Sequence, residues 1–169
     1  LIKQGSSLHE VANELNERDL ILSSFIFKLN AKVHNIDQSI KAGEYLLSTS
    51  ESIFTLQRKF IEGKFFYRKL QLLEGMTTRD ILNLSKSEGI VDDIDSNLEK
   101  LKLKLDINGQ TEGLFFPDTF YYQKGDLFSS LLKRAFEKQQ TVYFDLWQLR
   151  QEGLPYSSLI EAITLASII

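Results

Sequence analysis

Between residues 109 and 122 the chain reads GQTEGLFFPDTFYY, an aromatic run that contains one of its two prolines. Pro117 restricts the residue before it to extended backbone, and Gly113 permits a turn that a side chain would hinder. Asp118 directly follows the proline, where it can accept hydrogen bonds from the next backbone amides and brace a turn. We therefore expect a rigid aromatic wall with two carboxylates, Glu112 and Asp118, on or beside it.

Two interpretations fit this stretch. Sugar rings stack on aromatic faces while carboxylates accept hydrogen bonds from their hydroxyl groups, so the pattern is typical of a carbohydrate site. The alternative is a buried element that leads from a loop into a strand, in which Asp118 only braces the turn.

Composition limits the other classes of function. The 169 residues suffice for one domain or two small ones, and 43% hydrophobic and 25% charged residues are ordinary for a globular protein. The net charge of −3 argues against a dedicated nucleic-acid binder. Without cysteine there is no disulfide or thiolate ligand, and the two histidines, His9 and His34, are isolated. We expect no metal and no cofactor.

Residues 1–48 have the pattern of a small mixed module. Residues 1–4 and 44–48 are candidate strands, and Ser7 with Glu10 forms a capping box at the start of a helix. A second helix begins at Ser23 or Ser24. One side of it carries three apolar residues, Phe25, Leu29 and Val33. This strand-helix-helix-strand order is the layout of a LysM-like module.

The rest of the chain is mainly helical. Helices are predicted at 52–62, 77–87 and 91–105, a strand at 65–73, and a long helix after Asp126 whose apolar pattern continues through Leu146 and Leu149. Trp147 is expected in the core. The last helix, from Ser157 or Ser158, is apolar on most sides and should be buried at the centre of its domain.

An acidic cluster opens the predicted helix at 91–105. Asp92, Asp93 and Asp95 lack the glycine and the terminal glutamate of a calcium loop. Carboxylates also stabilise helix N-termini, so we interpret the cluster as helix N-terminal charge rather than as a cation site.

Four stretches resemble the endolytic murein transglycosylases, the MltG or YceG-like family. They are IKQGSSLHEVA at 2–12, IKAGEY at 40–45, LEGMTTRDI at 73–81 and EGLFFPDTF at 112–120, in the family's order. The last is similar to the family's signature, and LASII at 165–169 resembles the lead-in to its catalytic helix. The resemblance implies an α+β fold with a LysM-like βααβ module at 1–63. The N-terminal portion of a mixed, mainly helical YceG-like transglycosylase domain, of catalytic type, follows at 64–169.

The same resemblance implies a reaction. The family cleaves peptidoglycan glycan strands between N-acetylmuramic acid and N-acetylglucosamine without hydrolysis and leaves 1,6-anhydro ends. One glutamate would protonate the leaving oxygen and then assist attack by the muramyl 6-hydroxyl group. That glutamate would follow Ile169, so the catalytic residue is unknown within this chain, and we expect the 169-residue fragment to be inactive.

Site residues are carried over by match to the motif. Those expected to bind substrate or shape the cleft are Glu112, Phe116, Pro117, Asp118, Thr119 and Ser167. Glu74 matches a family position, but a glutamate at the end of a strand can equally cap a helix or form an ion pair. No metal ligand is implied.

The resemblance also implies a place and partners. The fragment would lie in the cell envelope on the outer, periplasmic side of the cytoplasmic membrane, anchored by an upstream transmembrane helix that the fragment lacks. Its partners would be peptidoglycan glycan strands, with cell-wall synthesis proteins as a second class. Neither nucleic acid nor direct membrane contact by the fragment is expected. The alternative function is a non-catalytic peptidoglycan-binding or envelope scaffold module.

Overall fold

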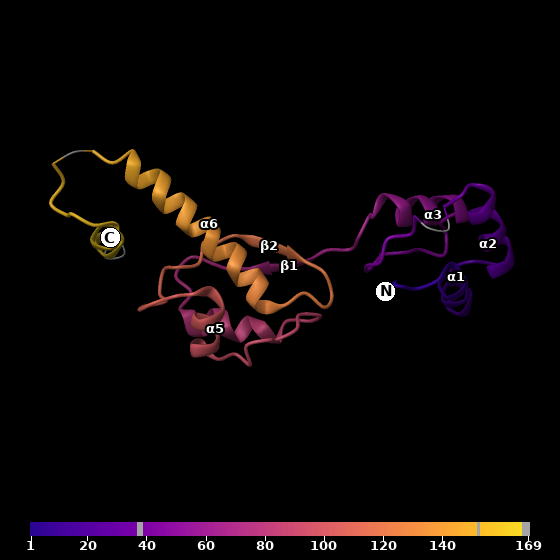
Figure 1. The fold of residues 1–169 in the computed structure, drawn as a ribbon, viewed down its shortest axis with the longest axis horizontal. Coiled ribbons are helices and arrows are strands. Elements are labelled where there is room, and N and C mark those ends of the chain that lie inside the picture. Colours follow the sequence, from indigo (N-terminus) through magenta and orange to yellow (C-terminus); the bar gives the residue numbers. More distant parts are fainter. Residues whose placement is uncertain (37–38, 152, 167–169) are drawn as a thin grey trace. The chain divides into compact units, whose positions relative to one another are not determined.

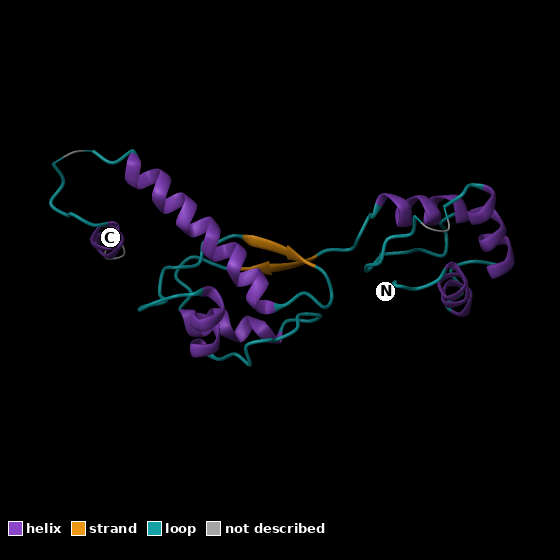
Figure 2. Ribbon diagram, in the orientation of Figure 1, coloured by secondary structure: helices purple, strands orange, loops and turns teal. Residues whose placement is uncertain are grey.

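The computed structural model describes residues 1–36, 39–151 and 153–166 (Figure 1). It confirms the α+β class, because helices dominate and one two-stranded antiparallel sheet is present (Figure 2). The chain divides into two compact units. The first unit comprises 1–69 and 121–125, and the second comprises 70–120 and the residues from 126 onward. The assignment of a LysM-like module and a transglycosylase-type domain stays a prediction.

Three helices build the first unit: α1 (Leu8–Glu17), α2 (Ser24–Val33) and α3 (Ile53–Glu62). The predicted capping box starts α1, since the Ser7 amide donates to Glu10 Oε2 at 2.9 Å and the Glu10 amide donates to Ser7 Oγ at 3.2 Å. Helix α3 ends at Gly63, whose left-handed backbone closes the last turn. The helices enclose a core that includes Val11, Ala12, Leu15, Phe27, Leu56 and Phe60.

The strands predicted at 1–4 and 44–48 do not form. A single antiparallel bridge joins Ile2 to Gly43, with hydrogen bonds of 2.8 and 2.9 Å in the two directions. Beyond this bridge the carbonyl of Glu44 accepts from the Phe66 amide at 2.7 Å, so the segment changes partner and no ladder develops. The LysM-like arrangement is therefore not confirmed.

The three apolar residues on one side of α2 face away from the core. The helix buries Phe27 and Ala31, whereas Phe25, Leu29 and Val33 are exposed. Apolar residues occur around much of this helix, so the 3.6-residue period did not determine which side faces the core.

The second unit contains α4 (Thr78–Asn83), the 3₁₀ turn η1 (Leu84–Lys86), α5 (Leu98–Leu105), α6 (Phe128–Gln148) and α7 (Leu159–Ala166). The strands β1 (Arg68–Gln71) and β2 (Thr119–Tyr122) form the sheet. The boundary between the units falls within both strands. The core of the second unit is formed by one side of α6 with residues before and within α5: Phe128, Leu131, Leu132, Ala135, Ile94 and Leu101.

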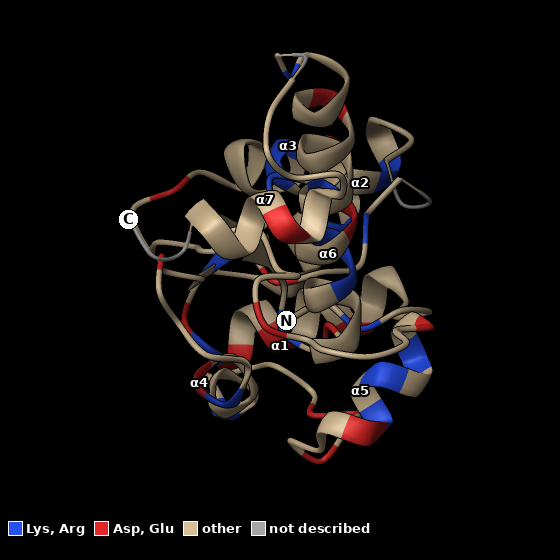
Figure 3. Cartoon of the chain, turned by 90° about the vertical axis from the view of Figure 1, so that its left-hand side faces the viewer, with Lys and Arg blue, Asp and Glu red and all other residues tan. Residues whose placement is uncertain are grey.

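The acidic cluster has a different role from the predicted one. Helix α5, whose charged residues are coloured in Figure 3, begins at Leu98 with Asn97 as its cap, so the aspartates precede it. Asp92 Oδ1 accepts from the amide of Ser96 at 3.1 Å and braces a turn. Asp93 Oδ1 accepts from the amide of Ser129 at 3.0 Å, in the first turn of α6. Asp93 therefore stabilises the start of α6 rather than the start of the helix that follows the cluster.

Two predictions of burial are also wrong. None of the described residues of α7, 159–166, is buried. In the last turns of α6, Leu146 and Leu149 are exposed, and Trp147 is half-buried with the Arg150 guanidinium 4.2 Å from its ring centroid. Apolar composition shows that a face can be buried, but burial also needs a facing element, which these described segments do not have.

Candidate functional site

A cleft of about 340 Å³ lies within the second unit. Three segments that are distant in the sequence form it: the turn at 72–78 that leads into α4, the loop at 111–117, and α6. The loop is the first part of the aromatic stretch. Its signature residues therefore stand beside the predicted strand end that contains Glu74.

The loop is attached to α6 by Tyr143, whose hydroxyl donates to the carbonyl of Gly113 at 2.9 Å. Gly113 adopts a φ of +74°, a conformation that glycine tolerates without strain. Burial raises the pKa of Tyr143, and a hydrogen bond from Gln139 opposes part of that rise. The phenol therefore stays protonated at neutral pH and keeps its role as a donor.

The loop is attached to α4 by Glu112, whose Oε2 accepts from the backbone amide of Thr78 at 2.9 Å. This amide belongs to the first residue of α4, where helical amides have no partner inside the helix. Thr77 and Asp80 cap the same helix with a reciprocal pair of hydrogen bonds. Glu112 thus holds α4 and the loop together at one side of the cleft.

Two residues that line the cleft, Thr78 and Gln139, each contain a buried polar atom without a partner. Thr78 Oγ1 and Gln139 Oε1 have no hydrogen-bond partner among the described residues, although Thr78 and Gln139 are only 3% and 6% exposed. A buried polar atom that lacks a hydrogen bond is costly.

One part of the cleft lining is apolar. Phe115 is buried and its ring lies 6.5 Å from that of Phe136, at a tilt of 57°. Pro117 and Ile81 complete this side. A rigid apolar wall beside two polar atoms is an arrangement that suits a sugar ring, which has one apolar and one hydroxylated aspect.

The sequence model of the YceG-like family matches residues 1–169. This chain belongs to the YceG-like family. Among curated proteins, none matches it. The crystal structure of a yceG-like protein from Listeria monocytogenes is similar, with 20% identity and a TM-score of 0.38 over 87% of this chain. The match covers 55% of the Listeria chain, so the YceG-like chain described here spans about half of that protein's length.

Of the site residues predicted for this YceG-like chain, the structure brings Glu112 and Pro117 to the cleft. Phe116 is half-buried beneath the Lys138 ammonium group, which lies 4.6 Å from its ring centroid. Asp118 accepts from the Thr119 amide at 2.7 Å and from Lys138, which lowers the pKa of Asp118. Phe116, Asp118 and Thr119 therefore lie outside the cleft lining. Ser167 lies outside the described residues.

Sequence reasoning missed Thr78, Gln139 and Tyr143. Gln139 had a visible signal, because it falls on the apolar side of α6, four residues after Ala135, where a polar side chain is unexpected. Tyr143 follows on the same side one turn later. Thr78 is the second residue of a threonine pair, and only the first, Thr77, was needed to explain the helix start.

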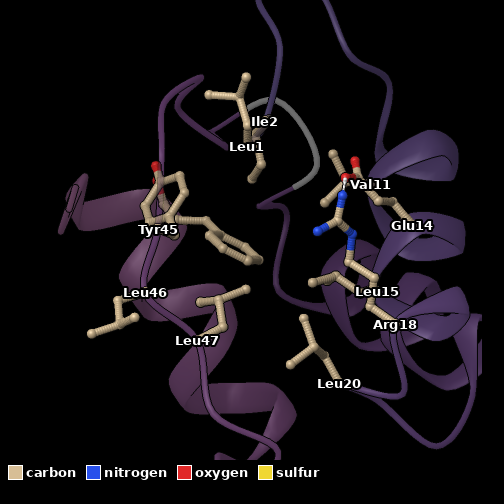
Figure 4. A pocket seen from close by; sticks show the side chains of 11 residues that line it. Leu1, Ile2, Val11, Glu14, Leu15, Arg18, Leu20, Tyr45, Leu46 and Leu47 are labelled. Carbon is tan, nitrogen blue, oxygen red and sulfur yellow. Dashed lines mark hydrogen bonds and ion pairs between the residues drawn. The ribbon is translucent and has the colours of Figure 1, made fainter. Parts of the chain in front are cut away.

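The first unit has its own cavity, of about 230 Å³ (Figure 4). Leu15 and Leu20 face Tyr45 and Leu47 across it. Its charged lining residues, Glu14 and Arg18, form an ion pair of 2.8 Å. Because this lining is mainly aliphatic, the cavity offers a sugar fewer polar partners than the cleft of the second unit does.

Within 1–36, 39–151 and 153–166, no group of three or more His, Asp or Glu residues is arranged to hold a metal ion. Over the same ranges, no helix combines the length and hydrophobicity that crossing a bilayer requires.

Proposed function

We propose that this YceG-like chain is the glycan-binding N-terminal part of a peptidoglycan lytic transglycosylase. The complete enzyme would cleave strands between N-acetylmuramic acid and N-acetylglucosamine and leave 1,6-anhydro ends. Family membership over the whole chain supports this proposal. The observation that carries it is the cleft, whose lining combines apolar residues with Thr78 and Gln139, each of which contains a buried polar atom without a partner.

The cleft would bind the glycan through complementary groups. Gln139 Oε1 can accept a hydrogen bond from the N–H of an N-acetyl group or from a sugar hydroxyl. The Thr78 hydroxyl can donate or accept. Phe115 and Pro117 would pack against the apolar aspect of a ring, and Tyr143 with Glu112 would keep the loop in place.

We propose that neither acid of the cleft is the proton donor. A single glutamate that serves as acid and then as base needs an apolar environment that favours its neutral form. Glu74 and Glu112 are both exposed, and Glu112 already accepts from the Thr78 amide. The donor would be the glutamate expected after Ile169, and the 169-residue chain would bind glycan without cleaving it.

The cell-envelope location on the outer side of the cytoplasmic membrane belongs to the same proposal. So does contact with cell-wall synthesis proteins.

The test separates binding from cleavage. Purified, peptide-free glycan strands are titrated into the 169-residue chain in a calorimeter, and the mixture is then analysed by mass spectrometry. We expect binding without anhydro products. Gln139→Leu and Thr78→Val should each weaken binding about tenfold, as expected for a lost hydrogen bond to a buried group.

The matched controls are Gln140→Leu and Thr141→Val, which make the same changes at exposed neighbours on α6. They should bind as the parent does. Equal affinity of all four variants would exclude the cleft as the glycan site. Anhydro products that disappear in Glu112→Gln would show that Glu112 is catalytic and overturn the assignment of the donor.

A further inference from the structure

Helix α2 carries apolar side chains on two opposite sides. Phe27 and Ala31 face the core and are fully buried. Five other apolar residues are exposed: Leu22 102%, Phe25 68%, Ile26 54%, Leu29 52% and Val33 68%. At 100° per residue the four that lie within α2 fall within an arc of about 100° that points away from the buried pair, and Leu22 directly precedes the helix cap. We call this set the outer stripe.

The charges beside the outer stripe are unequal. Along one edge, Lys28 and Lys32 line a hollow together with Phe25, Leu29 and the α1 residues Leu8 and His9. Helix α2 itself contains no acidic residue. Along the other edge lie Asp19 and Glu51, but Glu51 is paired with Lys59 at 2.6 Å.

The first unit as a whole is cationic. It holds 11 lysines and arginines against 8 aspartates and glutamates, a net charge of +3 in a chain of net charge −3. Exposed aromatic and aliphatic residues flanked by lysines are the composition of helices that lie on anionic membranes. A second copy of the chain fits less well, because stacking two outer stripes would bring their lysines close together.

We propose that the outer stripe docks the first unit onto the surface of an anionic lipid bilayer. Phe25, Leu29 and their neighbours enter the boundary between headgroups and acyl chains, while Lys28 and Lys32 pair with lipid phosphates. A ten-residue helix is about 15 Å long, too short to cross a bilayer, so α2 lies in the plane of the interface. This contact departs from the expectation that the fragment does not touch a membrane, and it is independent of the glycan cleft.

The test is co-sedimentation of the 169-residue chain with vesicles. Vesicles of equal parts phosphatidylglycerol and phosphatidylcholine should bind it, and vesicles of phosphatidylcholine alone should bind it at least about tenfold more weakly, because two lysines contribute to the attraction. Raising the salt concentration should weaken binding to the anionic vesicles.

Paired variants locate the contact. Phe25→Ser with Leu29→Ser should abolish binding to the anionic vesicles. Phe144→Ser with Leu146→Ser removes similar side chains that are 62% and 61% exposed in the second unit, and should leave binding unchanged. Lys28→Gln with Lys32→Gln should lower the partition coefficient about 30-fold. Lys100→Gln with Lys133→Gln removes equal charge elsewhere and should have little effect.

All the changed side chains are exposed or half-buried, so the thermal midpoint serves as a check that each variant is folded. No binding of the parent chain to anionic vesicles would overturn the proposal. Equal vesicle binding by the parent and the outer-stripe variants would also overturn it. The same holds if the stripe pair and the control pair lose binding equally. Binding of the stripe to an acidic protein without binding to vesicles would likewise replace the lipid surface with a protein partner.

Discussion

Gln139 is a polar residue in an otherwise apolar position, and its unsatisfied oxygen costs folding free energy in the absence of a ligand. In Gln139→Leu the relief of this oxygen offsets the lost hydrogen bond to Tyr143, so we predict that the free energy of unfolding, measured by urea denaturation, changes by less than about 1 kcal/mol. Glycan affinity would fall in the same variant. A large loss of stability instead would mean that Gln139 supports the fold rather than a ligand.

Protonation of Asp93 should lower the stability of the second unit. Burial alone would raise its pKa, but hydrogen bonds from Lys104 and Ser129 outweigh that effect and lower the pKa from 3.8 to about 2. A lowered pKa means that the folded state binds the charged form more strongly. This stabilisation is complete above about pH 4 and is lost as the pH falls through 2.

Asp93→Asn should therefore lower the free energy of unfolding by about 1 to 2 kcal/mol at pH 7, the scale of a lost helix cap with its charge. Between pH 4 and pH 2 the parent should lose stability more steeply than the variant. Asp95→Asn is the control, since Asp95 is exposed and pairs only with Lys100 among the contacts described. A pH dependence that is the same in parent and Asp93→Asn would contradict this role.

At the scale of elements, features that depend on neighbouring residues were predicted correctly. Features that depend on contacts between distant segments were not. The capping box at Ser7 depends on residues three positions apart and forms as the sequence predicts, and the helix start predicted at Thr77 contains a second such box. The strands at 1–4 and 44–48 depend on a distant partner, and only one bridge forms. The inward side of α2 could not be assigned from the sequence, because the helix is apolar on both sides.

The orientation of α2 gives a direct mutational prediction. Phe27→Ala should cost about 3 to 5 kcal/mol, the usual range for a buried phenylalanine. Phe25→Ala, two residues earlier on the exposed side, should change stability by less than about 0.5 kcal/mol. Thermal or chemical unfolding of both variants measures the difference. The reverse order would mean that the side of α2 with Phe25 faces the core.

Gly43, which forms the bridge to Ile2, belongs to the block at 40–45 that resembles the family. A Cβ atom at Gly43 would lie 2.5 Å from two carbons of the Phe65 ring, and the backbone φ is +153°. Gly43→Ala should therefore destabilise the first unit by about 1 to 3 kcal/mol.

Gly75, at φ +79° with no atom within 4 Å of an added Cβ, is the comparison. Gly75→Ala should cost about 1 kcal/mol from backbone strain alone. Equal costs for the two variants would show that Phe65 moves aside freely.

For the whole molecule, the sequence predicted the family and the α+β class, because the motif at 112–120 and the helical periods are both local patterns. It could not predict the cleft lining, because Thr78, Gly113 and Gln139 meet only through folding. It also predicted burial for α7, whose described residues are exposed. In both cases the sequence does not show which surfaces pack against each other in the folded protein.

The most direct measurement is a titration of ¹⁵N-labelled 169-residue chain with peptide-free glycan strands, followed by amide and side-chain NMR shifts. We predict that the perturbed signals cluster at Thr78, Gly113 and the side-chain amide of Gln139, and that Gln139→Leu removes the saturable shifts. Shifts confined to the first unit, or no saturable shifts at all, would contradict a glycan site in this cleft.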